Sequence, residues 1–182
     1  MKRHLTSLLA LLLISAVPAL RAQSTPAATT PDTSANSYGS LNGSNEFTLS
    51  GSGSGDKHFN HSLGGLDLSL GQFISDTTEI LVRQTFNYGG GSSFSTRLAL
   101  DEHFSTGKLR PFLGVNLGYV YGSAVSNTLA AGLEGGVKYY VHPQTFLFAL
   151  LDYSFLFRSS NQVSDRFGHG AFFWNVGVGF KL

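Results

Sequence analysis

Residues 171–182, Ala-Phe-Phe-Trp-Asn-Val-Gly-Val-Gly-Phe-Lys-Leu, decide the fold. From Trp174 to Leu182 every second side chain is apolar, and the residues between them are small or polar. A period of two residues is typical of a β-strand with one apolar face and one small or polar face. The stretch therefore predicts a strand with two chemically different faces.

The same alternation recurs upstream of this stretch. Seven further segments are separated by turn residues, at 46–52, 62–73, 78–88, 93–104, 111–122, 129–141 and 145–157. The chain is rich in Gly (22 residues) and Phe (15 residues) and has only 5 Pro, a composition that suits a curved sheet better than a helical domain. Tight turns alternate with connections that are longer or Gly-rich. We expect eight antiparallel strands in up-and-down order, closed into a barrel.

Charged residues indicate which face of the strands points inward. They lie near the middle of five strands, on the face opposite the aromatic residues: Asp67, Arg83, Arg97, Glu134 and Asp152. A soluble barrel of lipocalin type would put the apolar face inside, and a membrane barrel would put it outside. Aromatic residues near the strand ends favour the membrane arrangement, as in lipid-interface girdles: Tyr119, Tyr121, Tyr139, Tyr153, Phe155, Phe172 and Trp174. The predicted fold class is all-β, an eight-stranded antiparallel up-and-down transmembrane β-barrel.

The inward charges are expected to pair across a narrow lumen. A hairpin centred on Ser75 would place Asp67 opposite Arg83, and one centred on Gly90 would place Arg83 beside Arg97. Glu134 and Asp152 face each other if the next hairpin is centred on Pro143. An isolated buried charge costs several kcal/mol, so such groups must pair. We predict a salt-bridge network that closes the lumen; a gated pore is the alternative.

The N-terminal part differs from the rest of the chain. Residues 1–22 have a basic start, a short apolar run and small residues near the end, the pattern of a secretory signal peptide. Residues 23–44 are rich in Ser, Thr, Ala and Pro and predict a disordered linker. The predicted barrel domain is 45–182. With no Cys, an exported chain must be stabilised without disulfides.

Few residues suggest catalysis or ligand binding. The formal net charge is +1 and no polybasic run occurs, which argues against nucleic acid as a partner. His103-Phe104-Ser105 resembles the His-x-Ser element of outer-membrane lipid A deacylases, but Thr106 stands where that family has Asn. Asp56, His58, His61 and His169 lie in two expected external loops and could meet around a metal, but they lack the fixed spacing of metal ligands. We therefore predict no catalytic, cofactor or metal site.

The chain resembles the small bacterial outer-membrane β-barrel domain family of OmpA/OmpX type, through 70–76, 110–119 and 132–141. Its end resembles the C-terminal assembly signal of such barrels, matched by Asn175, Gly177, Phe180 and Leu182. The resemblance implies a monomer in the bacterial outer membrane, with membrane lipid and the barrel assembly machinery as partners. It implies little about activity, because a fold is not a function.

The sequence alone is compatible with three functions. We expect a non-enzymatic outer-membrane protein with an envelope-structural or surface-interaction role. The alternative is a porin-like conduit for small solutes or hydrophobic molecules. A lipid A-modifying enzyme is the third candidate, and it would rest on His103 and Ser105.

Overall fold

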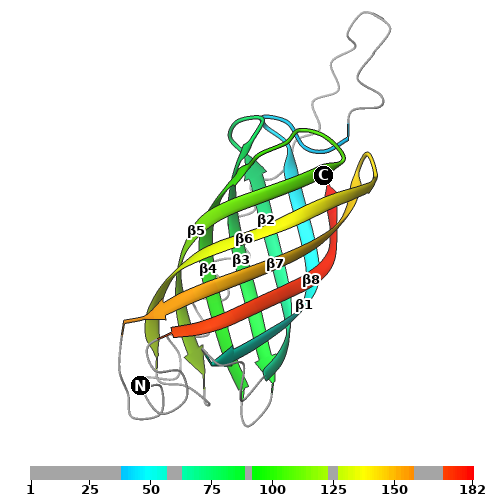
Figure 1. Ribbon diagram of the computed structural model, residues 1–182. Coiled ribbons are helices and arrows are strands. Elements are labelled where there is room, and N and C mark those ends of the chain that lie inside the picture. The colour runs from blue at the N-terminus through cyan, green and yellow to red at the C-terminus, as the bar shows by residue number, and fades with distance from the viewer. Residues whose placement is uncertain (1–37, 57–62, 89–91, 123–126, 158–169) are drawn as a thin grey trace, which may run out of the picture. The chain divides into compact units, whose positions relative to one another are not determined.

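The protein forms a closed antiparallel β-barrel in which each strand pairs with the next along the chain and β8 pairs with β1 (Figure 1). The computed structural model describes residues 38–56, 63–88, 92–122, 127–157 and 170–182. The strands are β1 (Asn45–Asp56), β2 (Leu63–Phe73), β3 (Thr78–Tyr88), β4 (Ser92–His103), β5 (Leu109–Gly122), β6 (Thr128–His142), β7 (Thr145–Leu156) and β8 (Gly170–Lys181). Closure leaves no unpaired sheet edge. The predicted eight-stranded up-and-down barrel is confirmed.

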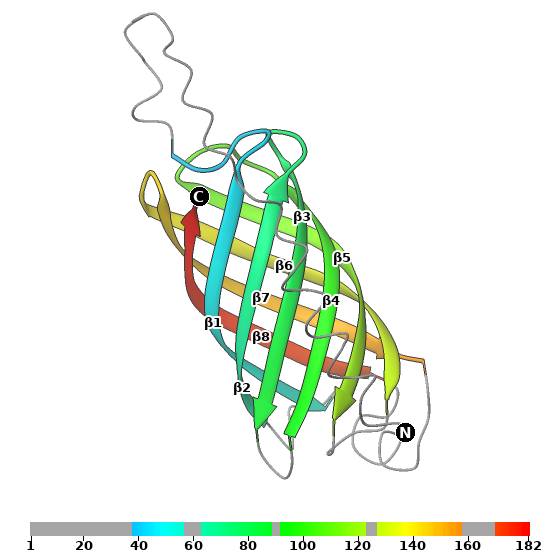
Figure 2. The ribbon, with the colours of Figure 1, turned by 180° about the vertical axis from the view of Figure 1, so that it is seen from behind.

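Side chains alternate between the lumen and the outer surface along every strand. On β5 and β6, for example, Leu113 and Leu133 are 61% and 62% exposed, whereas Asn116 and Glu134 are buried. The strands therefore turn an apolar face outward. Their inward face carries the buried polar and charged side chains, together with an apolar cluster formed by Phe112, Tyr140, Phe146, Phe148 and Leu150. This arrangement is the reverse of the lipocalin alternative, in which the apolar face would line the interior. Figure 2 shows the wall from behind, with β1 to β4 nearest the viewer.

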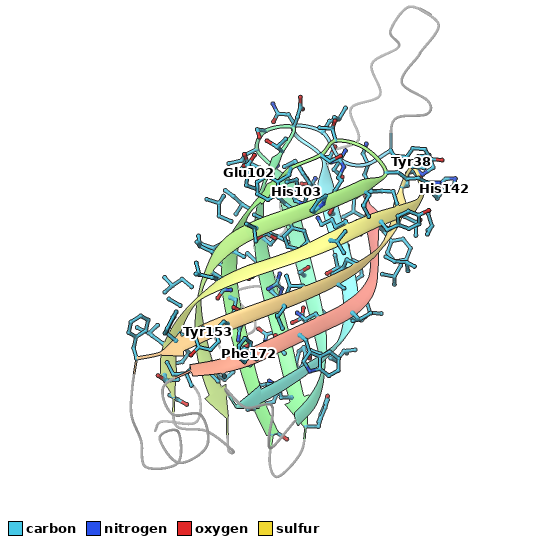
Figure 3. All side chains as sticks on the ribbon, viewed as in Figure 1. Tyr38, Glu102, His103, His142, Tyr153 and Phe172 are labelled. Atoms are coloured by element: carbon cyan, nitrogen blue, oxygen red, sulfur yellow. The ribbon has the colours of Figure 1, made fainter. Side chains whose placement is uncertain are left out.

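The two ends of the barrel differ in their connections. The described turns 74–77, 104–108 and 143–144 all lie at one end, which we call the turn end. Both ends of the barrel domain meet there, because the Leu182 N–H donates to the Asn45 carbonyl at 2.8 Å. Figure 3 shows His103 and His142 at the turn end and Tyr153 and Phe172 at the opposite, loop end.

Two boundaries differ from the sequence-based expectation. β1 extends to Asp56, through a Gly-Ser repeat that was expected to be a loop from residue 53 onward. The repeat continues as a strand because Gly53 pairs with Trp174, whose indole covers the space that a Cβ would take. In addition, residues 38–44 of the expected linker are bound to the turn end of the barrel.

The remaining N-terminal predictions concern other parts of the chain. The proposed signal peptide and residues 23–37 lie outside the described residues. Within the described ranges, no helix is long and apolar enough to cross a membrane.

Candidate functional site

The middle of the lumen holds a group of buried charged side chains. All five charges that the sequence analysis placed inward are nearly inaccessible: Asp67 (2% exposed), Arg83 (5%), Arg97 (4%), Glu134 (3%) and Asp152 (0%). They come from β2, β3, β4, β6 and β7, because period-two alternation turns each of them into the interior. Contacts between them therefore join different parts of the barrel wall.

Arg83 on β3 makes a bidentate contact with Glu134 on β6. Its Nη1 and Nη2 donate to Oε2 and Oε1 of Glu134 at 3.1 Å and 3.0 Å. A guanidinium and a carboxylate that share two parallel hydrogen bonds form a well-oriented, charge-assisted pair. Because β3 and β6 are not neighbours in the sheet, this pair crosses the lumen. Arg83 Nε also lies 3.8 Å from Asp67 Oδ1.

Arg97 on β4 makes a second crossing. Its Nη1 donates to Oδ2 of Asp152 on β7. The guanidinium carbon also lies 4.1 Å from the centroid of the Phe173 ring, a cation–π geometry. One face of the guanidinium and its Nη1 are therefore occupied, whereas Nε and Nη2 have no hydrogen-bond partner among the described residues.

Asn116 on β5 joins the two crossings. Its Nδ2 donates to Glu134 Oε2 at 2.5 Å and to Asp152 Oδ1 at 3.0 Å. We call these six residues the central network: Asp67, Arg83, Arg97, Asn116, Glu134 and Asp152. Asn116 was not predicted to belong to the central network. Its amide lies between Gly114 and Gly118 on the inward face, and this pattern could have indicated a polar residue of the lumen.

Two hydroxyl groups complete the hydrogen bonding of the carboxylates. Thr85 Oγ1 donates to Asp67 Oδ2 at 2.6 Å, and Ser154 Oγ donates to Asp152 Oδ2 at 2.8 Å. Buried carboxylates need several such donors, because burial removes the water that would otherwise solvate them.

The strand register places two of the three expected pairs as predicted. Arg83 is opposite Arg97, and Glu134 is opposite Asp152. The third expectation was wrong, because Asp67 is opposite Thr85 and Arg83 is opposite Ser69. The β2–β3 hairpin is thus centred one residue later than expected, and the long Arg83 side chain still reaches Asp67 along the diagonal.

A second charged cluster lies in the lumen nearer the turn end. Lys138 Nζ donates to Glu46 Oε2 at 2.5 Å and to Glu79 Oε2 at 2.6 Å. The Tyr140 hydroxyl donates to Glu46 Oε1 at 2.6 Å. We call Glu46, Glu79, Lys138 and Tyr140 the turn-end cluster. The sequence analysis did not find it, because Glu46 and Lys138 are far apart in the chain and no short hairpin relates them.

Glycine on the inner face leaves room for these side chains. A Cβ at Gly132 would lie 2.5 Å from Asp152 Oδ1, and a Cβ at Gly118 would lie 2.6 Å from Arg97 Cγ. The interior of an eight-stranded barrel is barely wide enough for side chains, so large residues require small neighbours. The alternation of Gly with charged residues is thus a packing requirement of the central network.

His103 and Ser105 make separate hydrogen bonds in the structure. His103 is buried between the rings of Phe73 and Phe112, at centroid distances of 5.1 Å and 5.3 Å. Its Nδ1 donates to the Thr77 carbonyl at 3.0 Å. Ser105 Oγ accepts a hydrogen bond from the Gly107 N–H at 3.0 Å, which is the geometry of a turn.

The structure does not test whether the loop histidines could bind a metal. His58, His61 and His169 lie outside the described residues. Among the residues that are described, no group of three or more His, Asp or Glu side chains is arranged to hold a metal ion.

The residues of the expected assembly signal occupy both faces of β8. Asn175 is buried and faces the lumen, whereas Phe180 and Leu182 are exposed on the outer wall. Gly177 lies against Ser50 of β1, where a Cβ would meet the neighbouring backbone. The end of the chain is thus fully built into the barrel seam.

Comparison with known proteins identifies the fold. No protein-family model and no curated protein matches the chain. The N-terminal β-barrel domain of Pseudomonas aeruginosa OprF is similar in structure, with a TM-score of 0.58 and 23% identity over 77% of this chain and 99% of that one. Neisserial surface protein A has a TM-score of 0.58 and 16% identity, covering 76% and 96%. The outer membrane protein OprG from Pseudomonas aeruginosa has a TM-score of 0.55 and 11% identity, covering 79% and 98%. The chain thus has the fold of small outer-membrane β-barrels.

Proposed function

We propose that the protein is an integral, non-enzymatic protein of the bacterial outer membrane whose lumen is closed by the central network. Its role is to support the envelope or to make contacts at the cell surface. The observation that carries the closure is the bidentate Arg83–Glu134 pair, which crosses the lumen at 3.0–3.1 Å.

The outer wall supports a place in the membrane. Leu113, Val115 and Leu117 of β5 are 61%, 51% and 57% exposed, and Leu133 of β6 adjoins them at 62%. Water-soluble proteins rarely expose so continuous an apolar surface, whereas a lipid bilayer is the solvent that such a surface requires. The closed sheet also satisfies its backbone hydrogen bonds internally, as a bilayer demands.

Aromatic residues near the strand ends supply the membrane interfaces. Tyr121 stacks on Phe94 at 5.7 Å and on Tyr119 at 6.0 Å, toward the loop end. Tyr153 packs on Phe172 at 4.8 Å at the same end. Tyrosine belongs at such a level because its ring is apolar and its hydroxyl reaches water. Short turns face the periplasm in outer-membrane barrels, so the turn end is the periplasmic end.

The proposed partners follow from this location. Lipids of the outer membrane cover the apolar wall, and the barrel assembly machinery recognises β8 through Phe180 and Leu182. The barrel acts as a monomer, because closure of the sheet leaves no edge for another chain to extend. The net charge of +1 disfavours nucleic acid as a partner.

The electrostatics of the lumen support closure to ions. An ion that passes Arg83 and Glu134 must separate a pair whose other surroundings are already occupied by Asp67 and Asn116. Uncovering buried charges without new partners costs several kcal/mol, so the closed arrangement dominates.

A solute conduit is the second candidate, and one observation favours it. Toward the loop end the lumen is lined by Ser52, Asn87 and Ser95, whose buried side-chain oxygens have no partner among the described residues. A surface of hydroxyl and amide groups suits water and small polar solutes. In this alternative the central network is a selectivity barrier that opens during transport.

Planar-bilayer recordings test the closure. The wild-type protein should show almost no conductance, and Arg83→Ala combined with Glu134→Ala should produce discrete channel openings. Glu102→Ala removes an exposed carboxylate of β4 and should leave the bilayer silent. Steady wild-type conductance would support the conduit instead. A double variant that remains silent would refute the role of the central network in closing the barrel.

A further inference from the structure

A short segment ahead of β1 crosses the turn end of the lumen. We call Tyr38–Ser44 the strap; Figure 3 shows Tyr38 at the turn end. Ser40 has 0% exposure, so the strap enters the mouth of the barrel instead of lying on its rim. The Gly43 N–H donates to the Phe73 carbonyl at 2.8 Å, which fixes the strap beside β2.

Arg110 at the start of β5 holds the strap from the opposite wall. Its Nη1 donates to the Ser40 carbonyl at 2.8 Å, and its Nη2 donates to the Tyr38 carbonyl at 3.0 Å. The same guanidinium also donates to the carbonyls of Thr106 and Gly107, at 2.9 Å and 3.2 Å. Arg110 is therefore bound partly by the strap and partly by its own turn.

The strap can be released because the Arg110 guanidinium divides its hydrogen bonds between the strap and the 104–108 turn. If the strap leaves, Arg110 keeps its contacts with the 104–108 turn, and the freed donors can be solvated at the open mouth. No charge is then left buried without a partner, which is the event that makes the loss of a buried ion pair so unfavourable. The other contacts of the strap are mainly polar too, such as Asn42 N–H to Asp76 Oδ1 at 3.1 Å and Lys181 Nζ to the Gly39 carbonyl at 3.4 Å. Water can replace such contacts at the mouth, so the strap can open locally at a lower free energy than the barrel unfolds.

The strap also covers the turn-end cluster. Ser40 Oγ donates to Glu46 Oε1 at 2.6 Å, and the same oxygen accepts from Tyr140. Lys138 holds the other oxygen of Glu46. The Tyr38 ring packs on the apolar cluster below, which includes Phe112. Release of the strap would therefore open a path from the periplasmic side to buried charges of the lumen.

We propose that the strap is a releasable gate at the periplasmic mouth of the barrel, with Arg110 as its latch. The gate lies in series with the central network. Its effect on conductance rests on the proposed closure of the lumen, whereas its seating does not.

Two glycines of the strap provide a matched test. Gly39 and Gly43 both have left-handed backbones, with φ of +90° and +83°. Alanine at either position imposes a similar backbone strain. A Cβ at Gly39 would collide with the Arg110 guanidinium, whereas a Cβ at Gly43 meets nothing within 4 Å. Gly39→Ala should therefore unseat the strap, and Gly43→Ala should not.

Cysteine alkylation measures the seating directly, because the chain contains no Cys. Ser40→Cys is the buried reporter and Asn42→Cys, at an exposed position of the strap, is the reference. In detergent micelles, Ser40→Cys should react with N-ethylmaleimide about 100-fold more slowly than Asn42→Cys, because reaction must wait for local opening. Adding Gly39→Ala should accelerate the buried reporter about 10-fold, and adding Gly43→Ala should change it less than about 2-fold.

Arg110→Lys is a second unseating variant, because an ammonium group lacks the planar fork that reaches both strap carbonyls. Heat-modifiable gel mobility verifies that each variant is folded. Equal reactivity of the Ser40→Cys and Asn42→Cys proteins would overturn the proposal. So would equal acceleration by Gly39→Ala and Gly43→Ala.

Bilayer recordings then test the gate. In the Arg83→Ala, Glu134→Ala background, adding Gly39→Ala should raise the open probability about 10-fold relative to adding Gly43→Ala, if local opening of the strap limits each event. If alkylation responds to Gly39→Ala but the open probability does not, the strap is seated as described but is not a gate. Silence in every variant would instead refute the central network as the closure and leave the alkylation result intact.

Discussion

Glu134 provides the sharpest test of the energetics of the lumen. Its carboxylate accepts two hydrogen bonds from Arg83 and one from Asn116. In Glu134→Ala, Arg83 loses its two hydrogen bonds to a carboxylate, and its remaining ion pair is the longer contact with Asp67 at 3.8 Å. Loss of one partner from a buried pair costs about 3–5 kcal/mol, because the other charge stays buried without compensation. Arg83→Ala should cost a similar amount for the same reason.

The double variant separates this explanation from simple loss of packing. With both groups removed, no uncompensated charge remains, so the total loss should fall short of the sum of the single losses by about 1–3 kcal/mol. Urea unfolding in lipid vesicles measures each free energy, with Trp174 as the single tryptophan reporter. Glu102→Ala removes an exposed carboxylate of β4 that accepts one hydrogen bond from Thr78, and should cost less than either single variant of the buried pair. Additivity of the Arg83 and Glu134 variants within about 0.5 kcal/mol would refute the reasoning.

Three further predictions concern packing, lipid contact and assembly. Gly132→Ala places a Cβ against Asp152 and should destabilise the barrel by about 1–3 kcal/mol in the same titration. Gly64→Ala, with nothing within 4 Å, should be neutral, and equal losses would contradict the packing argument. Leu133→Arg, outward in mid-strand, should cost about 2–4 kcal/mol in vesicles, whereas Val141→Arg near the end of the same strand should cost at most about 1 kcal/mol. The reverse order would mean that the bilayer does not surround the middle of β6. Phe180→Ala should reduce the amount of folded barrel in outer membranes, while Phe155→Ala, similarly exposed on the outer wall, should not. Immunoblots of unboiled membrane fractions measure the folded amount. Equal effects of the two variants would mean that β8 carries no assembly signal.

The strand pattern was readable from sequence because it depends on local chemistry alone. Each strand of a two-faced barrel must alternate, so the five inward charges could be assigned to the lumen before any pairing was known. Pairing within a hairpin was also accessible where the turn centre was clear, as for Glu134 and Asp152. The error at Asp67 arose because the 74–77 turn offers two possible centres, and a shift of one residue moves every pair.

Contacts between strands that are not neighbours could not be predicted from the sequence in this way. Whether Lys138 meets Glu46 or Glu134 depends on the tilt and stagger of the strands, which no short stretch of sequence specifies. The strap was missed for a different reason. Its contacts with Arg110 use backbone carbonyls, so the composition of 38–44 carries almost no signal of binding.

Heat-modifiable mobility of the protein in purified outer membranes tests whether the chain is a closed barrel with its apolar wall in lipid. A closed barrel with its apolar wall in lipid resists detergent at room temperature, so we expect an outer-membrane protein whose unboiled band migrates faster than the boiled one. A soluble periplasmic protein with a single mobility would contradict the account, because the exposed Leu, Val and aromatic side chains of the outer wall would then face water.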